Sequence, residues 1–160
     1  LLNLITSNNL IMKTEKPISF NPRVPRELKM FIEMTEDVYS IYEDVKWSNK
    51  SDLEIGFIYK NKKKTTEYFF GIWYDLWETY GIPLSITFSY TGKAPVEWHD
   101  KLKSFISKNM EEGIIVKDYE GWTCVLFDYS YFKFDKGNDA ERLSKFYFLT
   151  TDYADSIATE

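Results

Sequence analysis

The chain has little of the chemistry that most small enzymes use, because its 160 residues include one cysteine, Cys124, and one histidine, His99. A single cysteine excludes a disulfide within the chain and fits a reducing compartment. A Cys/His zinc site needs four ligands, and only two such residues are present. The seven glycines are scattered and form no GxGxxG or GxxxxGK phosphate loop. We therefore expect no metal and no cofactor.

The two residues that could act in nucleophilic catalysis have simpler interpretations. A Ser-His-Asp triad would have to use His99, which the pattern places on a helix as a surface histidine beside an apolar stripe. Cys124 lies within the strand pattern 122–127, which favours a buried, inert thiol over a nucleophile.

Long hydrophobic runs and a signal peptide are also missing. No apolar run approaches the length of a membrane span, and Asn and Ser interrupt the N-terminal segment. We expect a cytoplasmic protein that does not bind a membrane. The formal net charge of −5 argues against attraction of the whole surface to nucleic acid, but a local basic patch is compatible with it.

Aromatic side chains are abundant and make up 18% of the chain. They can build a core in which rings replace Leu and Val. This is the simpler interpretation, and a ring-lined groove for bases or sugars is the alternative.

The stretch from residue 65 to 90 organises the rest of the chain. Residues 65–75 are β-branched or aromatic almost throughout, with apolar residues on both faces, which favours a central strand covered on both sides. Gly71 leaves room for close approach of another backbone or ring. Asp75 and Glu78 have the spacing of a capping box, so residues 75–80 are expected to form one or two helical turns that Gly81 ends.

The strand that follows, at 83–90, alternates between apolar and hydroxyl-bearing residues. Leu84, Ile86 and Phe88 would face the core. Ser85 and Thr87 would face water, together with Ser89, which is the pattern of a half-buried strand.

The remaining elements follow from apolar periodicity, and the last helix would open with Asn138 as its cap. The expected helices are 26–45, 96–110 and one that begins at 138; the further strands are 52–60, 114–119 and 122–131. The order is therefore α-β-β-β-α-β-β-α. Two hairpin units imply an α+β fold in which three helices pack on a largely antiparallel sheet of about five strands.

Residues 25–160 are expected to form a single domain, and residues 1–24 an extended, proline-containing lead-in. Met12 begins a segment that looks like an ordinary bacterial protein start. Either the first eleven residues precede the true start, or the chain is part of a longer protein.

Acidic pairs keep carboxylate or Mg²⁺ chemistry open. Asp52 and Glu54, at the start of one strand, are the alternative metal candidates, although solvation of a strand end is the simpler interpretation. The cap explains Asp75 and Glu78, and two further acids would lie on the outward face of edge strands, where charge blocks unwanted pairing. These two acids are Asp118 and Asp128.

One dense basic run lies at the turn between the expected strand 52–60 and the central strand, and it is most simply a solvated hairpin turn. It consists of Lys60, Lys62, Lys63 and Lys64. It could instead contact phosphates, with Trp73 and Trp77 adding stacking if they face solvent. These six residues are the candidate site for nucleic acid or a partner protein.

Residues 68–88, YFFGIWYDLWETYGIPLSITF, resemble a segment of the non-catalytic, C-terminal accessory region of bacterial PD-(D/E)XK nuclease-superfamily proteins. There too a helix precedes an IGF-like strand, here 55–57, and an aromatic strand, a W/F-x-x-x-G-x-P-L turn (77–84) and a closing helix follow. As a pattern the resemblance runs from residue 25 to 157.

The nuclease motif itself does not carry over. It requires an Asp and then D/E-x-K on a strand, so that two acids hold Mg²⁺. Here D/E-x-K occurs at 27–29 and 44–46, on or at the end of the first helix. The resemblance therefore implies a non-catalytic binding domain, accessory to a nuclease-like or defence-related protein, that contacts a partner protein or nucleic acid. A small carboxylate-dependent hydrolase or nuclease is the alternative, and the sequence does not indicate an oligomeric state.

Overall fold

The computed structural model describes residues 26–39, 46–48, 54–61, 63 and 65–158, and for 26–30, 46–48 and 136 the backbone alone. The expected lead-in, the end of the first expected helix at 40–45, and Asp52, Lys62 and Lys64 lie outside the described residues.

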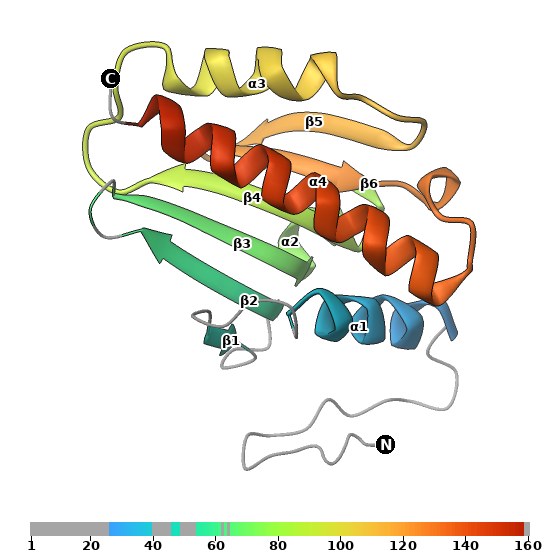
Figure 1. Cartoon of the computed structure of the whole chain (residues 1–160). Coiled ribbons are helices and arrows are strands. Elements are labelled where there is room, and N and C mark those ends of the chain that lie inside the picture. The colour runs from blue at the N-terminus through green and yellow to red at the C-terminus, as the bar shows by residue number, and fades with distance from the viewer. Residues whose placement is uncertain (1–25, 40–45, 49–53, 62, 64, 159–160) are drawn as a thin grey trace.

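Within the described residues, six strands form one sheet in the order β1-β2-β3-β4-β6-β5, and every neighbouring pair is antiparallel (Figure 1). This confirms the α+β class and the antiparallel sheet; the three-residue β1 adds one strand to the five expected. The strands are β1 (Lys46–Ser48), β2 (Glu54–Asn61), β3 (Thr66–Trp73), β4 (Leu84–Tyr90), β5 (Ile114–Tyr119) and β6 (Trp122–Phe127).

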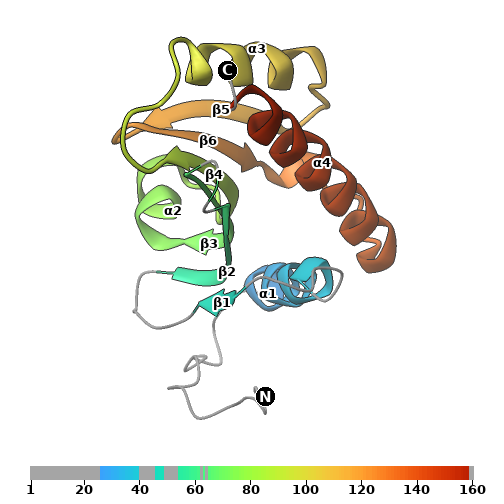
Figure 2. The ribbon, with the colours of Figure 1, turned by 60° about the vertical axis from the view of Figure 1, so that its left-hand side comes forward.

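Three of the four described helices cover one face of the sheet, and the short helix covers the other. The helices are α1 (Arg26–Tyr39), α2 (Tyr74–Tyr80), α3 (Trp98–Lys108) and α4 (Lys136–Ile157). Side chains of α1, α3 and α4 share the main core with the sheet, whereas Leu76 of α2 belongs to a second, smaller core. Figure 2 shows α2 on the side of the sheet opposite to α1 and α4.

The main core is built on apolar rows that run across the strands. Phe57, Phe70, Ile86 and Val125 are paired in register from β2 to β6, and all four are buried. From α4, the Tyr147 ring packs on this row, with its centroid 5.4 Å from that of Phe57 and 5.8 Å from that of Phe70. Alternation along each strand puts these residues on one face, and burial of their rings holds α4 against the sheet.

The strand β3 is covered on both faces, as its sequence predicts, and the close approach expected at Gly71 is present. A Cβ on Gly71 would lie 2.2 Å from the carbonyl oxygen of Ile55, and one on Gly56 would lie 2.1 Å from that of Phe70. Any side chain at either position would therefore push β2 and β3 apart.

The expectation that Ser85 and Thr87 face water is wrong. Both are fully buried, because α2 and the side chains of Leu76 and Leu126 build the second core on this side of β4 and β6. Alternation identifies which residues share a face, but it does not show whether another element covers that face.

Both assignments of an N-terminal helix cap are also wrong. The residue that precedes α2 is Trp73, and no side chain makes a cap hydrogen bond there, so Asp75 lies inside the first turn. The N-cap of α4 is Asp135, whose carboxylate accepts a hydrogen bond from the Asn138 N–H. The C-terminal cap of α2 is correct, because Gly81 takes the left-handed conformation with φ 75°.

The buried hydroxyl of Thr87 gives a stability prediction. Its Oγ1 has no hydrogen-bond partner in the described part of the chain, as is also the case for Ser85 Oγ. Replacing Thr87 by Val keeps the shape and removes an unsatisfied polar atom, so the free energy of unfolding in urea should rise by about 1 kcal/mol. Ser89→Ala is the control, because Ser89 is only half-buried and should change little. A loss of stability in Thr87→Val would show that the hydroxyl makes a hydrogen bond in solution.

Candidate functional site

The basic turn lies beside an acidic helix end. Lys60 and Lys63 are exposed, and the Lys60 ammonium is 3.8 Å from the carboxylate of Glu67 on the paired strand. At the base of the turn, Thr66 donates a hydrogen bond of 2.8 Å to Asp155, near the end of α4. Acids therefore stand close to this turn, which weakens its attraction for phosphate.

The structure does not bring the two tryptophans together with the lysines. Lys60 pairs with Glu67, but Trp73 pairs with Glu54 at the other end of the β2–β3 hairpin. Six residues along a strand separate the Cα atoms of Glu67 and Trp73 by about 20 Å. Trp77 packs against the main core, whereas Trp73 packs against the second core. The expected combination of basic turn and stacking tryptophans is therefore not formed as one site.

The acidic candidates do not converge either. Glu54 is half-buried at the start of β2, and Asp118 forms an ion pair of 2.9 Å with Lys103 of α3. Among the residues that the structure describes, no group of three or more His, Cys, Asp or Glu side chains is placed to hold a metal ion.

His99 does contact a hydroxyl, but that hydroxyl is inaccessible. The Nδ1 atom of His99 lies 2.8 Å from Oγ1 of Thr123 on β6, and Thr123 is fully buried. Burial lowers the pKa of His99 below its ordinary value of 6.5, against the opposing effect of Asp118. A substrate cannot reach Thr123 in this arrangement, so the pair holds α3 against the sheet.

Cys124 is buried in the second core, as its sequence context predicts. Burial raises the pKa of its thiol to about 12, so the thiolate is scarce at neutral pH.

One carboxylate fastens the end of α4 to β3. Asp155 Oδ1 accepts hydrogen bonds from the hydroxyls of Thr66 and Tyr68, at 2.8 and 2.5 Å. Burial, aided by the Asp155 hydrogen bond, raises the pKa of Tyr68 well above its ordinary value. The phenol therefore keeps its proton and serves as a fixed donor.

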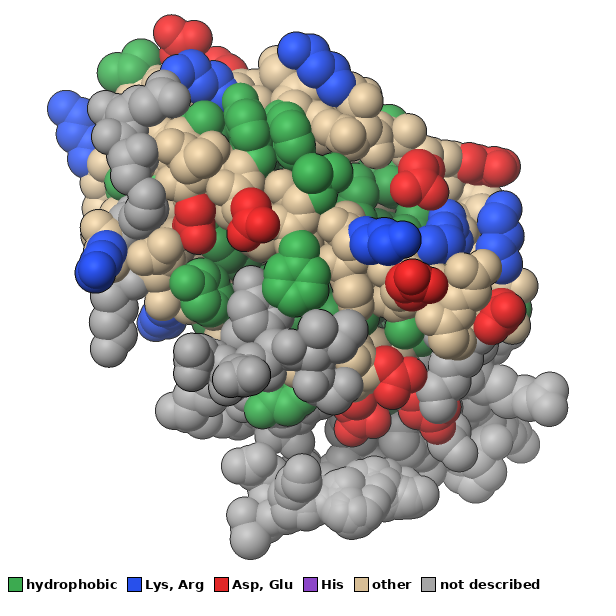
Figure 3. Space-filling view, in the orientation of Figure 1, with side chains coloured by type: hydrophobic (Ala, Val, Ile, Leu, Met, Phe, Trp, Pro, Cys, Tyr) green, Lys and Arg blue, Asp and Glu red, His purple; other side chains and the backbone are tan. Residues whose placement is uncertain are grey.

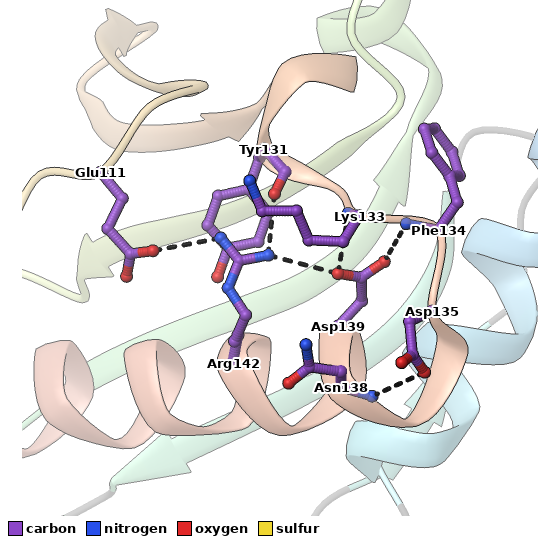
Figure 4. A network of polar contacts seen from close by, with 8 residues as sticks. All are labelled: Glu111, Tyr131, Lys133, Phe134, Asp135, Asn138, Asp139 and Arg142. Carbon is purple, nitrogen blue, oxygen red and sulfur yellow. Dashed lines mark hydrogen bonds and ion pairs between the residues drawn. The ribbon is translucent and has the colours of Figure 1, made fainter.

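A second carboxylate organises the connection between β6 and α4 (Figure 4). Asp139 is fully buried and accepts hydrogen bonds from the backbone N–H groups of Lys133 and Phe134, at 3.0 and 2.9 Å. Arg142 donates to Asp139 and to the carbonyl oxygen of Tyr131, and its guanidinium lies 4.0 Å from the centre of the Tyr131 ring. The Asp139 carboxylate and the Arg142 guanidinium both find their partners within the fold, so this network is structural.

Four partly exposed rings gather on the face of the sheet that α2 covers. Trp73, Tyr80, Tyr119 and Trp122 come from β3, α2, β5 and β6, and we call them the aromatic patch. The Trp73 ring lies edge-to-face against Trp122 at 5.5 Å and against Tyr119 at 6.0 Å; Tyr80 contacts Tyr119 at 6.4 Å. Among the described helices, only α2 lies on this face, and its seven residues leave these rings partly open to solvent.

Sequence reasoning found one of these four residues, Trp73. The sequence pattern places Tyr80 at the end of a helix, and Tyr119 and Trp122 at the two ends of a hairpin turn, with no reason to group them. The available signal was the aromatic pair at 119 and 122, on either side of Glu120-Gly121, which the β5–β6 register places opposite one another. Their contact with Trp73 depends on the strand order, which the sequence does not show.

The opposite surface offers a second, weaker candidate. A shallow groove of about 740 Å³ lies between α1 and α4, and its lining includes Ala140, Phe148 and Leu149. Among the described side chains on this face, Lys and Arg are interspersed with Asp and Glu (Figure 3). Neither shape nor charge there selects a ligand.

Comparison with known proteins adds no assignment. No protein-family model, no curated protein and no solved structure matches the chain. Within the described ranges, none of the helices is both long and apolar enough to cross a lipid bilayer.

Removing the Asp139 carboxylate should strongly destabilise the fold. In Asp139→Ala, two backbone N–H groups and Arg142 lose their partner, and the free energy of unfolding should fall by about 3 kcal/mol. Asp135→Ala is the control, because it removes only a long cap bond of 3.5 Å and should cost about 1 kcal/mol or less. Equal losses in the two variants, measured by urea denaturation, would contradict the central role of Asp139.

Because the chain has a single histidine, the change in the free energy of unfolding between pH 7 and 5.5 reports mainly the protonation of His99. Because the folded pKa of His99 lies below its unfolded value, the unfolded chain binds more protons in this window. Stability should therefore fall as the pH drops below 6.5, and His99→Gln should flatten that slope. An NMR titration of His99 should show a midpoint below 6.5; a midpoint above it would contradict the burial argument.

Proposed function

We propose that this chain is a non-catalytic binding domain that docks a partner protein through the aromatic patch. The observation that supports this proposal is the gathering of Trp73, Tyr80, Tyr119 and Trp122 as partly exposed rings on one face. Trp and Tyr dominate the energetically important positions of protein interfaces, because each ring buries a large apolar area and keeps a polar tip.

The charges around the patch favour a protein over nucleic acid. Three of the four rings belong to α2 and the β5–β6 hairpin, where four acidic residues accompany a single lysine, Lys117. A phosphate backbone requires several cations at its binding surface. The basic turn does not supply them to the patch, because it lies at the end of the β2–β3 hairpin opposite to Trp73.

The resemblance to an accessory region of nuclease-superfamily proteins is compatible with this proposal. Glu27 and Lys29, one of the two D/E-x-K matches, lie in α1 and not on a strand. A link to a nuclease-like or defence-related protein is therefore part of the proposal. The domain would position that protein, and any cleavage would be performed by catalytic residues outside this domain.

The patch can be tested with peptides selected from a random 12-residue library displayed on phage, using the full chain as bait. Peptides that bind the wild-type chain should lose about tenfold or more in affinity for Tyr119→Thr and Trp122→Thr, the loss typical of interface anchors. Threonine removes each ring while keeping a residue that suits a strand. Affinities are measured by calorimetry, and melting temperatures show that each variant is folded.

The matched control is Phe134→Ala, which removes an aromatic ring that is 51% exposed in the β6–α4 connection, outside the patch. This variant should bind the selected peptides as the wild type does. Peptides that bind Tyr119→Thr and Trp122→Thr unchanged would contradict the patch as the docking site.

A further inference from the structure

Two acids that accompany the aromatic patch, Glu78 and Glu120, have no structural role in the described part of the chain that would explain them. Asp75 lies in the first turn of α2, where a negative charge favours the helix, but Glu78 belongs to no side-chain cap. Glu78 is exposed on α2, and Glu120 is exposed in the turn between Tyr119 and Trp122. Asp118, in contrast, forms an ion pair with Lys103 of α3. Glu78 and Glu120 thus stand on the elements that carry the patch without a cap or an ion pair in the described part of the chain.

One ring of the patch already attracts a cation from within the chain. The Lys117 ammonium lies over the ring of Tyr80, 6.0 Å from its centre. The Tyr80 hydroxyl donates a hydrogen bond to the carbonyl oxygen of Asp118 at 3.4 Å, which turns the ring toward β5. The contact shows at the surface the attraction of a ring quadrupole for ammonium and guanidinium groups, which the other rings of the patch share.

We propose that the segment bound by the aromatic patch is basic, and that it places Arg or Lys side chains on the ring faces while Glu78 and Glu120 neutralise them. This inference rests on the proposed function and specifies the partner. Arginine fits best, because its planar guanidinium stacks on Trp and Tyr and is less strongly hydrated than an ammonium. The formal charge of −5 of the whole chain would speed the encounter with such a segment.

The test uses the peptides selected on phage against the full wild-type chain. Peptides that depend on Trp122 should be enriched in Arg and Lys compared with the unselected library. Charge reversal in the double variant Glu78→Lys/Glu120→Lys should weaken their binding by roughly tenfold, because like charges now face one another. Raising the salt concentration should weaken wild-type binding and have less effect on the double variant.

The matched control for the single variant Glu120→Lys is Glu141→Lys, which makes the same charge change at a carboxylate of α4 that is 65% exposed, on the other side of the sheet. It should leave binding unchanged. A loss in Glu141→Lys equal to that in Glu120→Lys would mean attraction to the net charge alone, and would overturn the inference.

The two proposals fail in different ways. Peptides that need Tyr119 and Trp122 but lack basic residues, or that ignore the charge reversal, would overturn the basic partner and leave the docking site intact. Peptides whose binding is unaffected by both ring variants would overturn the docking site, and the basic partner with it.

Discussion

The fold depends on the burial of β3 on both of its faces. On one face, Tyr68, Phe70 and Ile72 join the rings of β2 and α4 in the main core; on the other, Phe69 and Trp73 face the second core, which α2 covers. A strand buried on both sides must have well-covered neighbours, so β2 and β4 pair with it along their lengths. Gly56 and Gly71 allow this, because they let the two backbones approach where a side chain would block them.

The unequal cover of the two faces explains where the candidate site lies. Long helices protect the main core, and side chains of α3 and α4 interlock there: the Phe105 and Tyr153 rings are stacked with centroids 4.0 Å apart. The other face has one helix of seven residues in the described part of the chain. Rings at the border of the second core remain partly exposed to water. This exposure does not help the chain to fold, but it suits a surface that a partner covers.

Two carboxylates, one buried and one half-buried, fasten the helix α4 at its two ends. Asp139 holds the connection that leads into α4, and Asp155 holds its last turns against Thr66 and Tyr68 of β3. Such bonds are strong because water is excluded, and each would leave unpaired polar groups if it were broken. The helix therefore has one position on the sheet, and the titratable groups that look most like a catalytic centre act as structural fasteners.

The sequence by itself determined the existence and order of the four helices and of strands β2 to β6, since alternation and helical spacing report local backbone geometry. It also identified the double-sided strand β3, the close approach at Gly71 and the buried Cys124. Only the tertiary structure decided which faces are covered, as the buried Ser85 and Thr87 show, and which caps are used. In the tertiary structure, Trp73 lies far from the basic turn and its ring contacts those of Tyr119 and Trp122, which come from other strands. Such contacts depend on strand order and packing, and neither is encoded in the spacing of neighbouring residues.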